Sequence, residues 1–181
     1  ANLCNKKTLK EAGEDISKLP ETWDEFGQLG QRVTDFSVPR IGYSLIGMDW
    51  CSWPFTAWVW SAGGEMVKEN GDGTYKLGFD EEPGVEAAYF MNQMIWQYKM
   101  TQKDVMASLD DINNDVKSGK SCFSFTSLNS LRQSDLDEFG LNISDYIDMP
   151  LPSKDASIPR VALSGGEVIT FNPKSSPEQL K

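Results

Sequence analysis

Four of the six tryptophans in the sequence, Trp50, Trp53, Trp58 and Trp60, stand within eleven positions of one another. An indole ring offers a rigid, flat, apolar face, on which the C–H faces of sugar rings can stack. Asp49, beside the first of these rings, could accept hydrogen bonds from hydroxyl groups. These residue types and this spacing therefore suggest a platform for a neutral, hydroxyl-bearing ligand, provided that some of the rings are exposed.

The residues around the tryptophans predict that one of them is buried. Pro54 suits the first position of a helix, where its missing N–H is not needed, and the predicted helix runs to Ala62. Helical spacing places Trp58 on the inward face of this helix. Trp60 falls on another face, and the pattern leaves open whether its ring is core or surface.

Trp50 and Trp53 are expected to lie outside this helix. They follow a predicted buried strand over 41–47 and occupy the loop between strand and helix. Open α/β sheets bind ligands beyond the carboxyl ends of their strands, so this loop is a candidate binding site. The alternative is that both rings only cover the top of the core.

Catalysis is disfavoured by the composition. The sequence contains no histidine, the commonest general base and metal ligand. Two carboxylates suffice for glycoside hydrolysis, but adjacent acidic residues at helix starts are typical of helix capping. We therefore expect no catalytic residue among the three acidic pairs, Glu81–Glu82, Asp110–Asp111 and Asp137–Glu138.

The one segment with calcium-loop character does not fit the pattern. Asp135, Asp137 and Gly140 have the right spacing for the start of such a loop. Phe139 occupies the fifth position, however, and Tyr146 stands where the bidentate glutamate belongs. The sequence therefore predicts neither a metal site nor a bound cofactor.

Charge and length exclude other classes. The 181 residues carry a net charge of −10, which would repel nucleic acid. No apolar run approaches the ~18 residues of a membrane helix. The three cysteines, an odd number without a CxxC pair, do not indicate a disulfide framework.

Predicted strands and helices alternate, which indicates an α/β fold. A hairpin is expected around Asn70–Gly73. One long helix, 83–99, presents Val85, Ala88, Tyr89, Asn92, Ile95 and Trp96 on one face. The other predicted strands cover 2–5, 121–126 and 147–151, and the other helices cover 6–12, 22–33, 108–117 and 127–139. Thr22 with Glu25 and Ser108 with Asp111 form capping patterns at the starts of two of these helices.

The order of several segments resembles the extracellular solute-binding proteins of ABC importers, in the sugar-binding branch that includes the maltodextrin-binding protein. The resemblance covers nearly the whole chain, and its specificity comes from the order of the motifs rather than from any single one. It rests on Asn2–Lys6 with Leu9–Gly13, Leu19–Phe26, Trp60–Gly64, the helix 83–99, Val116–Phe123, Met149–Pro152 and Gly165–Gly166.

The resemblance implies a two-lobed, periplasmic-binding-protein-like α/β fold that closes over its ligand. Residues 1–163 would form most of the carboxyl-terminal lobe. Residues 164–181 would form a segment that crosses back to an amino-terminal lobe. The implied partners are that lobe, the membrane permease subunits of an ABC importer, and a mono- or oligosaccharide. The implied location is extracellular, either lipid-anchored or periplasmic.

The resemblance also implies further site residues. Trp50 and Trp53 match a loop that carries a stacking aromatic ring in sugar binders. After the predicted strand 121–126 the family often has Gly-x-Trp, where this sequence has Ser127-Leu128-Asn129, so Asn129 could hydrogen-bond a sugar but cannot stack on it. Gly165 and Gly166 match a glycine pair at the cleft edge, where bare backbone approaches the ligand.

Two other functions remain open from the sequence. One is a carbohydrate-active enzyme domain that uses two carboxylates 5–10 Å apart, a separation of the order seen in glycosidases. The other is a lectin-like surface module without a transporter. Both share the aromatic platform with the first reading, so the tryptophans do not separate them.

Overall fold

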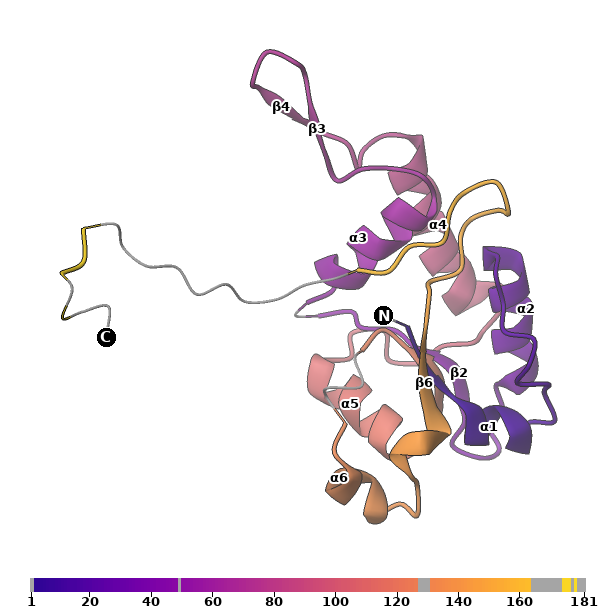
Figure 1. Ribbon diagram of the computed structural model, residues 1–181. Coiled ribbons are helices and arrows are strands. Elements are labelled where there is room, and N and C mark those ends of the chain that lie inside the picture. Colours follow the sequence, from indigo (N-terminus) through magenta and orange to yellow (C-terminus); the bar gives the residue numbers. More distant parts are fainter. Residues whose placement is uncertain (1, 49, 127–130, 164–173, 177, 179–181) are drawn as a thin grey trace.

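The computed structural model describes residues 2–48, 50–126, 131–163, 174–176 and 178. Strands and helices alternate along the chain, which confirms the α/β class (Figure 1). The elements are β1 (Asn2–Asn5), α1 (Lys6–Glu11), α2 (Trp23–Val33), β2 (Ile41–Ser44), α3 (Ser52–Ser61), β3 (Val67–Glu69), β4 (Tyr75–Leu77), α4 (Glu82–Trp96), α5 (Leu109–Lys117), β5 (Ser121–Ser124), α6 (Gln133–Asp137), the 3-10 helix η2 (Ile143–Asp145) and β6 (Tyr146–Met149).

Four strands form the central sheet, in the order β2-β5-β1-β6. β2 and β5 are parallel, whereas β1 is antiparallel to both β5 and β6. β2, β5 and β6 therefore run in one direction, and their carboxyl ends lie along the same edge of the sheet. The sheet has a core on each face. Leu3 and Cys4 are neighbours in β1 and point to opposite faces, and they belong to two separate core clusters.

Local capping explains where two of the helices begin. Before α2, the Thr22 hydroxyl accepts from the backbone N–H of Glu25, and the Glu25 carboxylate accepts from the Thr22 N–H. Ser108 and Asp111 form the same reciprocal pair before α5. Each pair satisfies N–H groups that have no partner inside the helix. Both capping patterns were predicted and are confirmed.

The predicted strand 2–5 is confirmed as β1, and the other three strands of the central sheet are confirmed but shorter. β2 ends at Ser44 instead of residue 47, and β5 ends at Ser124 instead of residue 126. The strand expected over 147–151 is β6, Tyr146–Met149, and Leu151 forms only an isolated bridge with Val161. The apolar character of a segment therefore continues past the point where strand pairing stops.

Trp58 is the centre of the main core. Its side chain is fully buried, as predicted, and comes from the middle of α3. Around it, α2, β2 and α4 each contribute rings at edge-on or tilted angles. The ring centroids lie between 5.3 and 6.1 Å from that of Trp58, for Trp23, Phe26, Tyr43 and Phe90.

The outward face of α4 is apolar. The residues predicted to share one face include Val85, Tyr89 and Trp96, which are 61%, 63% and 69% exposed. The inward face is a second apolar stripe that passes through Gly84 and Phe90. Gly84 approaches the chain so closely that a Cβ there would lie 1.8 Å from the Phe79 carbonyl oxygen. Helical periodicity identified one apolar face, but close packing selected the other for burial.

Two other predictions have different outcomes. The hairpin is confirmed, with β3 and β4 antiparallel and Gly71 and Gly73 at positive φ. The helix predicted over 127–139 is wrong in extent within the described residues, where α6 spans five residues and ends before Gly140 at φ 63°. Among the described residues, no helix is long and apolar enough to cross a membrane.

The packing around Trp58 predicts a large difference between two tryptophans. Trp58→Ala removes a ring from the centre of the core and should lower the free energy of unfolding by about 3–5 kcal/mol. Trp96→Ala removes an exposed ring and should change it by about 0.5 kcal/mol or less. Urea denaturation monitored by circular dichroism measures both, and equal losses would contradict this account of the core.

Candidate ligand-binding site

Trp50 and Trp53 lie just beyond the carboxyl end of β2. Trp50 is 62% exposed and Trp53 is 43% exposed, so neither ring is buried in the core. The two rings meet edge to face, with centroids 6.4 Å apart and planes at 73°. Because β5 lies beside β2 and runs parallel to it, the chain leaves both strands at the same edge. The two exposed indoles therefore stand where an open α/β sheet receives ligands.

The position of Trp53 differs from the prediction. The helix α3 begins at Ser52 instead of Pro54, so Trp53 belongs to the first turn of the helix rather than to the loop. Pro54 is then the third helical residue. A proline is tolerated throughout the first turn, since those N–H groups have no acceptor inside the helix. The helical backbone therefore holds the Trp53 ring more firmly than a loop would.

Trp50 has a left-handed backbone conformation, with φ at 66°. For a residue with a Cβ this conformation costs roughly 1–2 kcal/mol. Two backbone hydrogen bonds enclose it, from the Cys51 N–H to the Met48 carbonyl (3.1 Å) and from the Trp53 N–H to the Trp50 carbonyl (2.9 Å). The turn that they form aims an exposed indole outward from the start of α3.

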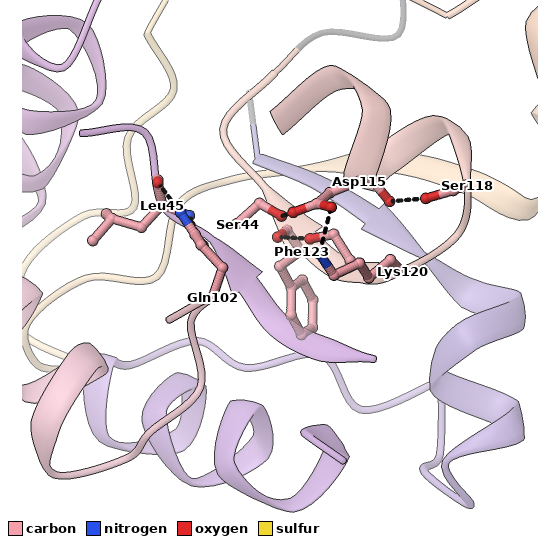
Figure 2. Close-up of polar contacts among 8 residues, drawn as sticks. Ser44, Leu45, Gln102, Asp115, Ser118, Lys120 and Phe123 are labelled. Carbon is pink, nitrogen blue, oxygen red and sulfur yellow. Dashed lines mark hydrogen bonds and ion pairs between the residues drawn. The ribbon is translucent and has the colours of Figure 1, made fainter. Parts of the chain in front are cut away.

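The segment that follows α4, distant in the sequence, supports this turn. The Gln102 side-chain amide binds both backbone groups of Leu45, accepting from its N–H at 3.0 Å and donating to its carbonyl (Figure 2). Two residues later, the Gly47 N–H donates to the Ala107 carbonyl at 3.1 Å. A Cβ at Gly47 would lie 1.6 Å from the Val105 carbonyl oxygen, so this close contact requires glycine.

On the opposite face of the sheet, a polar network holds β2 and β5 against α5. The Asp115 carboxylate accepts from the Lys120 ammonium at 2.8 Å and from the Ser44 hydroxyl at 3.4 Å (Figure 2). Ser44 is paired with Ser124 across the two parallel strands. The Ser44 contact therefore ties the carboxyl end of β2 to α5, and the Lys120 contact ties the residue before β5 to the same carboxylate.

Two of the six carboxylates weighed as catalytic groups have structural roles. Hydrogen bonds from Ser108 lower the pKa of Asp111, which caps α5. Hydrogen bonds from Lys68 and Lys76 lower the pKa of Glu81. A general acid needs a raised carboxyl pKa, so the environment of these groups is the opposite of what acid catalysis requires. Within the described residues, no cluster of three metal-ligating side chains occurs.

None of the other five predicted site residues falls in the part of the chain that the structure describes. Asp49, Ser127, Asn129, Gly165 and Gly166 lie outside the described residues.

The remaining tryptophan of the cluster, Trp60, is half-buried. Within the part of the chain that the structure describes, its indole N–H is buried without a hydrogen-bond partner. The sequence had left its position open.

Sequence reasoning missed the residues that support the site. Gln102 lies 57 positions from Leu45, and a single glutamine in a polar segment carries no signal of its partner. Gly47 was included in a predicted strand, without its close approach to Val105 being foreseen. Cys51, which is exposed and stands between Trp50 and Trp53 in the sequence, was also given no role.

The sequence matches the family described as bacterial extracellular solute-binding protein over residues 3–176. The chain belongs to this family. Its members are binding proteins rather than enzymes, which removes the enzymatic alternative. A search of curated protein sequences found no match.

Solved structures of this solute-binding class share the fold. The maltose-bound MalE3 of T. maritima is 25% identical, with a TM-score of 0.74 over 98% of this chain and 44% of that one. A Thermotoga lettingae ABC transporter solute-binding protein bound with α-D-tagatose is 21% identical, with a TM-score of 0.73 over 88% and 40%. The chain therefore spans less than half the length of these proteins, and the likeness to the second shows the fold alone.

The cysteines of this family member provide a test of the site's exposure. Burial raises the pKa of Cys4 and of Cys122 to about 12, whereas Cys51 is exposed beside the tryptophans. At pH 8, a thiol reagent should therefore modify Cys51 alone in the folded chain and all three thiols in denaturant. Mass spectrometry after alkylation measures this, and rapid modification of Cys122 under native conditions would contradict the placement of β5.

Proposed function

We propose that this chain is a ligand-binding lobe of the solute-binding component of an ABC importer, and that Trp50 and Trp53 form part of the wall of a cleft for a carbohydrate. Membership of the family supports the binding role. The observation that supports the site is the exposure of two adjoining indoles at the carboxyl edge of the sheet. Placing two large apolar rings in water is unfavourable unless a ligand covers them.

The chemistry of the two rings suits a sugar. A pyranose has an apolar C–H face and a rim of hydroxyl groups. A flat indole can contact the first, while backbone and side-chain polar groups bind the second. Asp49, Ser127 and Asn129 are proposed as further hydrogen-bonding groups.

The proposed cleft has a second wall. The chain spans 40% and 44% of two structurally similar solute-binding proteins, whose remaining length includes what we propose as the amino-terminal lobe. Residues 164–181 are proposed as the segment that returns to that lobe, with Gly165 and Gly166 at the cleft edge. A ligand that contacts both walls favours the closed arrangement by its difference in affinity for the two states. A membrane permease then receives it.

This proposal predicts the effect of removing each ring. In the full-length parent protein, Trp50→Ala and Trp53→Ala should each weaken binding of the cognate sugar by ~1–3 kcal/mol, because stacked area is lost. Trp96→Ala, an equal truncation at an exposed position on α4, should leave the affinity unchanged. Isothermal titration against a panel of mono- and oligosaccharides identifies the sugar and measures the three affinities.

The outcomes separate the role of the rings from the fold. Circular dichroism should show that all three variants remain folded. Unchanged affinity in both Trp50→Ala and Trp53→Ala would refute the role of these rings in the cleft. Failure of every sugar to bind the parent would refute the carbohydrate assignment.

A further inference from the structure

A second concave site lies at the end of α4, in a hollow of about 340 Å³. It is formed between the last turn of α4, the loop before β2 and the segment that follows α4. None of its residues lines the proposed sugar site, although Gln102 and Val105 also contact the segment that leads to it. Four apolar side chains line it: Phe36, Ile95, Trp96 and Val105.

Two aromatic rings of this wall are unusually accessible. Trp96 is 69% exposed and Phe36 is 55% exposed, although they come from positions 60 residues apart in the sequence. The fold has therefore brought two solvent-exposed rings to one hollow. Ligand sites are concave and mainly apolar, and a few polar groups fix the orientation of the ligand.

The available polar groups of the hollow are cationic. Lys103 places its ammonium group 5.6 Å from the centre of the Phe36 ring, and Lys99 also lines the hollow. In the part of the chain that the structure describes, neither lysine forms an ion pair, whereas Lys68, Lys120 and other cations do. Two unpaired ammonium groups beside an apolar wall are notable in a chain of net charge −10.

The neutral polar groups of the hollow are already engaged. The Gln102 amide binds both backbone groups of Leu45, and the Thr101 hydroxyl donates to the Gln102 carbonyl at 3.2 Å. A sugar would find few partners for its hydroxyl groups there, and unpaired hydroxyls are costly to bury. The hollow therefore differs in chemistry from the site at Trp50 and Trp53.

We propose that this hollow binds a small amphipathic anion, an aromatic or branched aliphatic group that carries a carboxylate. The apolar part lies against Trp96 and Phe36, and the carboxylate pairs with Lys99 and Lys103. Complementary charge and the loss of exposed aromatic area both favour this occupant. The site is independent of the proposed function, because it shares no residue with the sugar cleft.

The test uses 1-naphthylacetate and its uncharged analogue 1-naphthylacetamide as probes. Each is titrated into the ¹⁵N-labelled 181-residue chain, and the indole N–H resonance of Trp96, assigned with Trp96→Phe, is followed. The acid should shift this resonance saturably. The amide keeps the ring but lacks the charge. Its affinity should be about tenfold lower, because it loses a modest contribution from ion pairing with the lysines.

Matched variants assign the effect to the hollow. The double variant K99Q/K103Q should weaken binding of the acid by about tenfold, whereas K10Q/K18Q, an equal charge change at exposed lysines elsewhere, should leave it unchanged. Trp96→Ala should abolish saturable binding, as followed by shifts of backbone amides in 99–105. Tyr89→Ala, at an exposed ring on the same helix, should not.

Three results would overturn the proposal. The first is that the acid gives no saturable shift up to about 10 mM. Its affinity would then be far weaker than that of ordinary small ligands. The second is that acid and amide bind equally, which would indicate non-specific apolar contact. The third is that Tyr89→Ala weakens binding as much as Trp96→Ala, which would extend the contact surface along α4 and favour a macromolecular partner. Circular dichroism of every variant separates these results from unfolding.

Discussion

Both candidate sites depend on the position of β2 at the edge of the sheet, where one side of the strand has no neighbouring strand. An edge strand leaves backbone N–H and carbonyl groups without strand partners. Here the segment after α4 supplies them: the Met100 carbonyl accepts from Tyr43 at 2.8 Å, and the Gln102 side chain binds Leu45. By covering this edge, the same segment supports the turn that presents Trp50 on one side and supplies much of the second hollow's wall.

Tryptophan occupies two opposite environments in this chain. Trp58 fills the centre of the core, where four other rings surround it and exclude water. Trp50, Trp53 and Trp96 are 62%, 43% and 69% exposed. Both environments use the same property of tryptophan. Its large, rigid, apolar ring makes favourable contacts with apolar groups that cover it. Position relative to the sheet decides whether the ring is buried or left exposed.

Predictions from the sequence were correct where the interacting residues are close together in the sequence. The caps at Thr22 and Ser108, the glycine-rich hairpin and the burial of Trp58 depend on residues within a few positions, and all were predicted correctly. The start of α3 was misplaced because proline is compatible with several first-turn positions. α4 was harder, since both of its faces are apolar and only the packing of Gly84 and Phe90 selects the buried one.

By itself, the sequence determined the α/β class, the family resemblance and the candidate role of Trp50 and Trp53, because periodicity, capping and motif order are written in neighbouring residues. Only the tertiary structure decided that both rings are exposed, that Gln102 and Gly47 hold their turn in place, and that Phe36 joins Trp96 in a second hollow. These outcomes depend on contacts between residues about 50–60 positions apart, as for Leu45 and Gln102, and no local pattern encodes such a pairing.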